Sequence, residues 1–204
     1  MSKVYGCIPT RNDVPLDVAR HMAAACGRVG ASWGKAKCKY AVDVARNRGV
    51  ALARGEEATH LFMCDDDTYI PPDAVERLLA LDAPVATGVT ATTKLVEGST
   101  TPLINVAFTE VGGVPRFSRS WFTGTRPVRY CGASCILIRM DVFETIGFPW
   151  WTITHQLTDG KYIDRSEDIT FCDRCRTPAR RRGELSPGHA VPVGGCPTYL
   201  SRRG

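Results

Sequence analysis

A short apolar segment that stops at three consecutive aspartates constrains this chain more than any other feature of its sequence. Leu61–Cys64 is apolar, and Asp65, Asp66 and Asp67 follow it directly. An apolar run of this length between polar flanks is typical of a buried strand in an α/β sheet. The sequence therefore predicts a strand whose carboxyl end, where open α/β sheets bind their ligands, carries a cluster of carboxylates.

The three aspartates have two explanations. In an extended segment alternate side chains share a side, so Asp65 and Asp67 would point one way and Asp66 the other. Two carboxylates on one side suit an Mg²⁺ or Mn²⁺ ion that carries the phosphates of a substrate. Alternatively, the aspartates cap the helix introduced by Pro71–Asp73, because acidic residues favour helix N-termini. We favour the metal site, since one aspartate would be enough for a cap.

Composition limits the class of protein. The chain has 204 residues, of which 44% are hydrophobic and 23% charged, as in a soluble globular protein of one well-buried domain or two small ones. No segment has the apolar length of a signal peptide core or a membrane span, so we expect a cytoplasmic protein. Nine cysteines without a regular spacing indicate reduced thiols, not a disulfide framework.

The net charge of +5 belongs to the C-terminal end. From Asp173 onward, seven arginines oppose only Asp173 and Glu184, whereas basic and acidic residues balance before that point. Excess positive charge can bind along a polyanion by neutralising its phosphates. It can equally serve solubility or contact with a partner.

Alternating strand and helix patterns predict an α/β fold. The expected strands are 3–9, 61–64, 83–89, 103–108, 127–130 and 136–138, and the expected helices are near 16–23, 40–54, 74–80, 141–147 and 166–171. Segments 27–39 and 90–102 have the composition of loops. The two adjacent tryptophans, Trp150 and Trp151, form either a corner of the core or a ring platform for sugars or bases.

Several residues near the expected strand ends could contact a ligand. Pro9, Thr10 and Arg11 follow the first strand and form either a plain turn or one wall of a nucleotide pocket. Asn47 places an amide inside a helix, where it needs a partner or an exposed face. Small residues around Gly132 permit the close approach of a ligand or of backbone.

These motifs occur in one order along the chain: Pro9-Thr10, Ala45-Arg46-Asn47, His60 to Asp67, Pro71 to Val75, Gly132 to Arg139, Pro149-Trp150 and Glu167-Asp168. In that order the sequence resembles GT-A fold glycosyltransferases, particularly the compact family 2-like enzymes common in bacteriophages. The resemblance implies a Rossmann-like, mixed and mainly parallel central sheet flanked by helices. It also implies a hexosyltransferase with a nucleotide-sugar donor, of which a UDP-sugar is favoured.

The resemblance covers about residues 3–183. We expect residues 1–183 to form the glycosyltransferase domain, and residues 184–204 to form a basic tail rich in Gly, Pro and Arg that packs on or extends the same domain. If a bacteriophage encodes the enzyme, it would act in the cytoplasm of the bacterial host.

The resemblance also assigns roles on the donor side. Asp65 and Asp67 match the family's DxD motif, whose carboxylates hold Mn²⁺ or Mg²⁺ against the donor diphosphate, with Asp66 beside them. The loop Pro9–Arg11 would contact the nucleobase. Asn47 would face the donor pocket, where Gly132 would also lie.

On the acceptor side, Glu167 and Asp168 match the family's acidic pair. Asp168 is the expected general base, which takes the proton of an acceptor hydroxyl in a direct displacement that inverts the anomeric carbon. From spacing alone, Glu167 and Asp168 could instead begin the following helix, where acidic residues are favourable.

His189 has two possible uses. Many relatives carry a histidine after a late strand as a further metal ligand, and His189 is the candidate here, although it follows Arg180–Arg182 more closely than the family pattern predicts. Alternatively, Cys172, Cys175, His189 and Cys196 supply the four ligands of a structural zinc ion. Cys172 and Cys175 could also be ordinary helix residues.

The acceptor has several candidates. Related phage enzymes can modify hydroxymethylated pyrimidines in DNA, so we expect such a hydroxyl, with the arginine-rich C-terminal part holding the DNA. A polysaccharide, lipid-linked or protein hydroxyl is the alternative. Two other classes stay open: a nucleotidyltransferase, which shares the metal-diphosphate chemistry, and a zinc-containing nucleic-acid-binding module without catalysis, in which the aspartates are structural.

Overall fold

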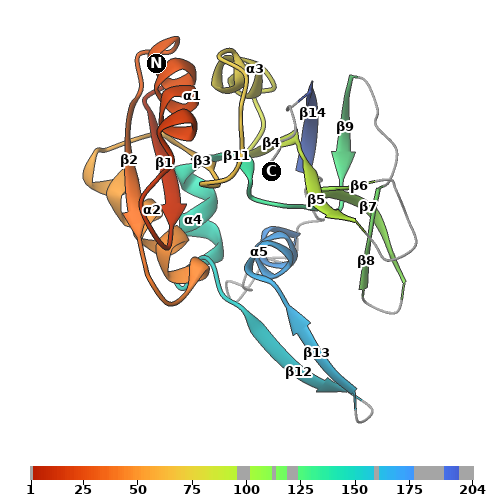
Figure 1. The fold of residues 1–204 in the computed structure, drawn as a ribbon. Helices are drawn as coiled ribbons and strands as arrows, with labels where there is room; N and C mark the ends of the chain where they lie inside the picture. Colours follow the sequence, from red (N-terminus) through yellow and green to blue (C-terminus); the bar gives the residue numbers. More distant parts are fainter. Residues whose placement is uncertain are drawn as a thin grey trace.

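A seven-stranded sheet forms the centre of the computed structural model, which describes residues 2–95, 102–111, 114–118, 124–158, 161–176 and 191–197 (Figure 1). The strand order is β2 (Ser32–Lys37), β1 (Val4–Thr10), β3 (His60–Cys64), β11 (Cys135–Arg139), β4 (Val85–Val89), β14 (Val191–Pro197) and β9 (Thr125–Val128). Only β11 and β9 run against the other five strands. The expected α/β class, with a mixed and mainly parallel sheet, is confirmed.

Helices cover both faces of this sheet. The helices α1 (Leu16–Gly27) and α3 (Ala74–Leu79) pack on one face, and α2 (Val42–Gly55), α4 (Met140–Ile146) and α5 (Glu167–Arg176) pack on the other. Strand β3 therefore buries Phe62 and Cys64 on the first face and Leu61 and Met63 on the second. Burial on both faces explains why this strand is apolar without alternation.

Smaller sheets are added beyond the central one. Strands β7 (Val106–Val111), β8 (Val114–Phe117) and β10 (Tyr130–Cys131) form one, and β5 (Ala91–Leu95) pairs with β6 (Pro102–Ile104). Strands β12 (Thr154–Thr158) and β13 (Lys161–Arg165) form a hairpin that projects from the body just before α5 (Figure 1).

Several of these strands lie where the sequence predicts loops or leaves the structure open. Strand β2 falls in segment 27–39 and β5 in segment 90–102, while β14 falls in the expected tail. Strand β2 pairs with β1 and β14 pairs with β4, both outside the segment of the strand itself. Such pairing depends on partners that local composition does not reveal. The division of the chain at residue 183 stays a prediction.

Helix α2 lies close against β1 because Gly49 faces the sheet. A Cβ atom at Gly49 would lie 2.8 Å from Cys7 Sγ and 3.2 Å from Met63 Cε. We expect Gly49→Ala to lower the free energy of unfolding by about 1–3 kcal/mol, since overpacking outweighs the better helix propensity of alanine. Urea denaturation would measure this loss.

Gly55 provides the matched control on the same helix. A Cβ atom there would meet nothing within 4 Å. Gly55→Ala should therefore leave stability unchanged or raise it by up to about 1 kcal/mol. Equal effects of the two substitutions would contradict this account of how α2 packs on the sheet.

Candidate active site

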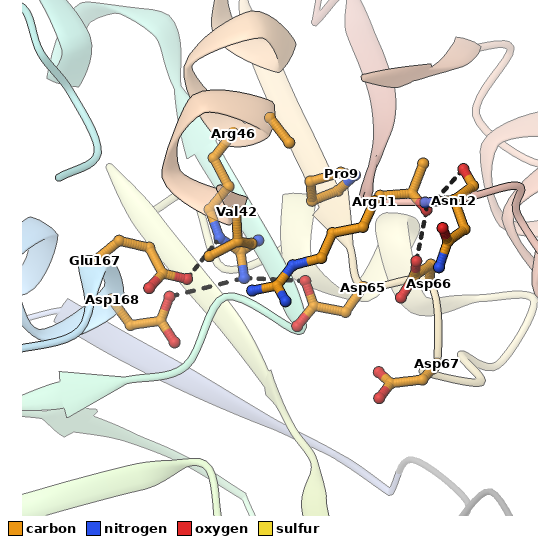
Figure 2. Close-up of a pocket in the computed structure, with 12 residues that line it drawn as sticks. Pro9, Arg11, Asn12, Val42, Arg46, Asp65, Asp66, Asp67, Glu167 and Asp168 are labelled. Carbon is orange, nitrogen blue, oxygen red and sulfur yellow. Dashed lines mark hydrogen bonds and ion pairs between the residues drawn. The ribbon is translucent and has the colours of Figure 1, made fainter. Parts of the chain in front are cut away.

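A pocket of about 440 Å³ lies at the carboxyl ends of β1 and β3 (Figure 2). Parallel strands bring their carboxyl ends to one edge of a sheet, and residues distant in sequence meet there. The lining comes from the loop after β1, the first half of α2, the aspartates after β3 and the start of α5: Pro9, Thr10, Arg11, Asn12, Val42, Ala45, Arg46, Asp65, Asp66, Asp67, Glu167 and Asp168. Eight of the predicted site residues are thus in one place, and their roles stay predictions.

The three aspartates form a tight turn. The Thr68 N–H donates to the Asp65 carbonyl at 3.1 Å, which closes the turn directly after β3. The Asp66 carboxylate accepts a hydrogen bond of 2.5 Å from the Thr10 hydroxyl. Asp67 is exposed and lies apart from Asp65 in Figure 2. The alternation expected of an extended strand therefore does not apply, because the strand ends before the first aspartate.

The alternative role of the aspartates, as helix caps, finds no support. Helix α3 begins at Ala74, several residues after the turn. Asp73 occupies its N-cap position without a side-chain capping hydrogen bond. Asp65, Asp66 and Asp67 line the pocket instead.

Arg46 is the residue that connects the two halves of the pocket. Its side chain is buried, and its guanidinium contacts Asp65 Oδ1 at 3.0 Å, Glu167 Oε1 at 3.2 Å and Asp168 Oδ1 at 3.8 Å. The contacts to Asp65 and Asp168 share one nitrogen, Nη2. Burial alone would lower the pKa of Arg46, but the three carboxylates outweigh burial and raise this pKa. One fixed cation therefore holds both the aspartate turn and the start of α5.

An aromatic stack supports this cation from the core. The guanidinium carbon of Arg46 lies 5.4 Å from the centre of the Trp151 ring. Trp151 is buried and stacks on Phe171 of α5, with ring centroids 4.2 Å apart. Trp150 is also buried. The core-corner explanation of the two tryptophans is the one that the structure supports, since neither lines the pocket.

Asn47 does not face the pocket, contrary to the expectation from the resemblance. Its amide nitrogen donates to the carbonyls of Asp43 and Trp151 at 2.8 and 2.7 Å. Its oxygen accepts from the backbone N–H groups of Trp150 and Trp151 at 3.1 and 3.2 Å. Asn47 thus fixes the tryptophan segment that supports Arg46. The sequence motifs assigned no role to Arg46 itself.

A signal for Arg46 was present in the sequence. Arg46 follows Val42 by four residues and precedes Val50 by four, a spacing that places all three on one face of a helix. That face is buried at Ala45, Gly49 and Val50. A charged residue on a buried helix face needs carboxylate partners, so the spacing indicates an ion-pair cluster.

Asp168 has a strongly raised pKa. Its Oδ1 atom is buried without a hydrogen-bond partner, while the side chain as a whole is 25% exposed. Burial raises the pKa of Asp168 to about 7, with Arg46 opposing the rise and Glu167 and Asp65 adding to it. A carboxyl group with such a pKa can take up a proton near neutral pH.

Gly132 allows a close approach to Asp168. A Cβ atom at Gly132 would lie 3.6 Å from Asp168 Oδ2 and 3.3 Å from the Asn105 side chain. Gly132 also donates its N–H to the Asn105 carbonyl at 2.7 Å. Gly132 lies beside Asp168 and is not among the residues that line the pocket, and its contact with the donor stays a prediction.

The predicted zinc set finds no support among the described side chains. Cys172 lies in the core, with its Sγ 3.9 Å from Cys131 Sγ. Burial raises the pKa of Cys175, which disfavours the thiolate that zinc requires. His189, predicted either as a zinc ligand or as a third metal ligand, lies outside the described residues. The side chain of Cys196 lies outside them too.

The charge of the pocket fits a divalent cation that arrives with its substrate. Five carboxylates line it against two guanidiniums, those of Arg11 and Arg46. Within the part of the chain that the structure describes, no three His, Cys, Asp or Glu side chains are grouped to hold a metal by themselves. Mg²⁺ usually binds through one or two carboxylates together with substrate phosphates, and this lining offers that arrangement.

The sequence profile described as glycosyl transferase family 2 matches residues 37–147, which is more than half of the chain. The chain belongs to glycosyl transferase family 2. Members of this family generally use a nucleotide-sugar donor and a divalent metal ion. No curated protein matches the sequence. The resemblance stated from the motifs is thereby confirmed at the level of the family.

Solved structures bear on the fold of this family 2 chain. A197 from STIV is 17% identical, with a TM-score of 0.57 over 84% of this chain and 76% of that one. CMP:2-keto-3-deoxy-manno-octonic acid synthetase complexed with CTP is 16% identical, with a TM-score of 0.36 over 71% and 77%. HddC from Yersinia pseudotuberculosis complexed with GMP-PN is 13% identical, with a TM-score of 0.34 over 85% and 99%. Of these three, A197 alone supports a shared fold.

The family 2 chain shows no membrane-crossing helix in the part that the structure describes. Each of its helices is too short or too polar to span a bilayer. The cytoplasmic location stays a prediction.

Proposed function

We propose that this family 2 enzyme transfers a sugar from a nucleotide-diphosphate sugar, with a UDP-sugar as the favoured donor, to an acceptor hydroxyl with inversion. One observation carries the proposal: the buried Arg46 contacts both Asp65 in the aspartate turn and Asp168 at the start of α5. Groups suited to a metal-bound diphosphate and to a general base therefore share one pocket. Its volume of about 440 Å³ lies within the usual range for small-molecule sites.

The donor would lie across the pocket. Asp65 and Asp67 would hold Mn²⁺ or Mg²⁺ against the diphosphate, where the cation supplies positive charge that stabilises the departing group. The nucleoside would occupy the part of the pocket formed by Thr10, Arg11 and Asn12. Figure 2 shows Asn12 on the far side of Asp65 from Asp168. The hydrogen bond from the Thr10 hydroxyl to the Asp66 carboxylate holds that loop against the aspartate turn.

Asp168 would act as the general base through Oδ2, because Oδ1 is buried toward Arg46. The acceptor oxygen forms a bond to the anomeric carbon while the bond from that carbon to the diphosphate oxygen breaks. The acceptor proton passes to Asp168, and the nucleoside diphosphate leaves with the bonding electron pair. The raised pKa of Asp168 makes its carboxylate a stronger base than an ordinary aspartate.

The hydroxyl of a hydroxymethylated pyrimidine in phage DNA is the first acceptor to test. The support is the positive charge that the sequence concentrates after Asp173. Polysaccharide, lipid-linked and protein hydroxyls are the other arms of an acceptor screen. A nucleotidyltransferase would release pyrophosphate instead of a nucleoside diphosphate, so identifying the released product separates the two reactions.

Donor binding gives the direct test. Calorimetry with nucleoside diphosphates and their sugars, with and without Mn²⁺, would compare wild type with Asp65→Asn and Asp67→Asn. Asparagine removes the charge but leaves an oxygen for Arg46. We expect each substitution to weaken metal-dependent binding roughly 10- to 100-fold, a loss typical even of groups that only support metal ligands.

Asp73→Ala is the control, because Asp73 follows the same loop and lies outside the pocket. It should bind the donor like wild type. Metal-dependent binding that survives in both aspartate variants would refute the assignment of Asp65 and Asp67. A folded wild-type protein that binds no nucleotide at all would refute the proposed reaction.

A further inference from the structure

Strand β2 carries a basic and aromatic surface that the proposed reaction does not use. Among the described strands it lies at the edge of the central sheet and pairs with β1 alone (Figure 1). Ala36 is buried in the core, whereas the alternate positions, Trp33, Lys35 and Lys37, are exposed. Lys39 and Tyr40 follow the strand and are exposed too. We call Trp33, Lys35, Lys37, Lys39 and Tyr40 the basic–aromatic strip.

The rings of this strip are accessible. Tyr40 is 85% exposed and Trp33 37% exposed. Lys39 Nζ lies 5.9 Å from the centre of the Tyr40 ring. The Cβ atom of Trp33 lies close to Gly6, where an added Cβ atom would be 2.8 Å from it. An accessible indole and an accessible phenol thus flank the lysines.

Among the residues that the structure describes, the charge of the strip is only partly compensated. Lys35 Nζ and Lys37 Nζ both lie 3.5 Å from the same atom, Asp13 Oδ1, so one carboxylate serves two ammonium groups. Both lysines hold the pKa of Asp13 below its usual value, Lys37 more strongly. Lys39 and Arg11, also exposed, add two further cations to this region of the chain.

The strip leads to the mouth of the pocket. Lys37 is the register partner of Thr10, and the Cys38 N–H donates to the Thr10 carbonyl at 2.9 Å. Thr10 and Arg11 line the pocket, and Figure 2 shows the Arg11 side chain reaching toward Asp65. A polymer on the strip would therefore pass directly beside the proposed active site.

We infer that the basic–aromatic strip binds single-stranded nucleic acid, with phosphates on the lysines and bases stacked on Tyr40 and Trp33. A positive groove interleaved with exposed rings is the usual means of holding a single strand without sequence preference. An acidic peptide would satisfy the lysines but not the rings. A duplex keeps its bases stacked inside and offers none to Tyr40. This binding does not involve Asp65, Asp67 or Asp168, and so it goes beyond the proposed reaction.

Protection of the sheet edge is the competing explanation of these lysines. Lysine on an edge strand prevents pairing with other chains. That role accounts for Lys35 and Lys37 but not for Lys39, which lies beyond the strand, nor for a tyrosine left 85% exposed beside it. Exposed rings on an edge would promote association, not prevent it.

Fluorescence anisotropy with the full chain and a labelled DNA strand of about 16 nucleotides tests the inference over a salt series. Each phosphate contact on a single strand adds about 0.7 to the slope of log K against log salt. The triple variant Lys35→Gln/Lys37→Gln/Lys39→Gln should lower this slope by about 2. Tyr40→Ala should weaken binding roughly tenfold with the slope unchanged, because stacking carries no charge.

The control variant removes three arginines of ion pairs elsewhere, Arg28→Gln/Arg77→Gln/Arg139→Gln, and matches the triple variant in net charge. It should keep the wild-type slope. An equal loss in both triple variants, equal binding of polyglutamate, or aggregation of the lysine variant without weaker DNA binding would each overturn the inference. Metal-dependent donor binding should be intact in all these variants, which separates this result from a failure of the proposed reaction.

Discussion

Replacing Arg46 with leucine is expected to lower the free energy of unfolding by about 3–5 kcal/mol, as when one partner of a buried ion pair is removed. Arg46 is 2% exposed and is the cation that Asp65, Glu167 and Asp168 share. Leucine would fill much of the space but leave those carboxylates in a poorly solvated wall. Urea denaturation at neutral pH would measure the loss.

Arg28→Leu is the control for this prediction. Arg28 forms an exposed pair with Glu76 at 2.7 Å, and such pairs contribute about 0–1 kcal/mol. Adding Asp168→Asn to Arg46→Leu should restore part of the stability, because one carboxylate fewer is left without its cation. A loss below about 1 kcal/mol in Arg46→Leu would show that the cluster is not held by this arginine.

Asp168→Asn is expected to reduce sugar transfer about 10²- to 10⁴-fold, the usual contribution of a general base. Asparagine keeps the shape of the side chain but cannot accept the acceptor proton. Donor affinity should change little, because the aspartate turn and Arg46 are retained. Turnover with saturating donor, measured beside the dissociation constant of the donor, separates the two effects.

The matched control is Asp173→Asn on the same helix. Asp173 bridges Arg165 and Arg176 and lies outside the pocket, so its substitution should leave turnover within a few-fold of wild type once the protein is folded. Turnover of Asp168→Asn above a tenth of the wild-type rate would refute its role as the base.

The pH dependence of stability gives a second readout of the same variant. The pKa of Asp168 is raised by burial to about 7, so the folded protein binds this proton more tightly than the unfolded chain. The resulting stabilisation is complete below the unfolded pKa of about 4 and is lost as the pH rises through about 7. In metal-free protein, wild type should therefore gain stability over Asp168→Asn as the pH falls from 8 to 5. A constant difference would contradict the raised pKa.

The local sequence pattern was sufficient to predict the strands and helices that carry the site. The apolar run Leu61–Cys64 predicted strand β3 inside the main sheet, and the strand–helix order predicted the α/β class. Carboxyl ends of parallel strands meet at one edge, so the order of the elements alone predicts that Pro9–Arg11 and the three aspartates lie near each other. The motif order also identified the family that the sequence profile confirms.

Contacts between distant parts of the chain decided features that the local sequence pattern does not predict. The edge strand β2 depends on pairing with β1, which the composition of β2 does not reveal. The aspartate turn replaced the expected alternation, because β3 ends at Cys64 and a backbone hydrogen bond closes the chain on itself.

The same division holds at the site. The sequence by itself determined that carboxylates gather where β3 ends and where α5 begins. Only the tertiary structure decided that Arg46, and not its neighbour Asn47, connects them. Arg46 and Asn47 are successive residues about 100° apart on a helix, so whether each meets the pocket or the tryptophan segment depends on how α2 is rotated against the sheet. Packing fixes that rotation, through Gly49 on β1 and Trp151 on Phe171.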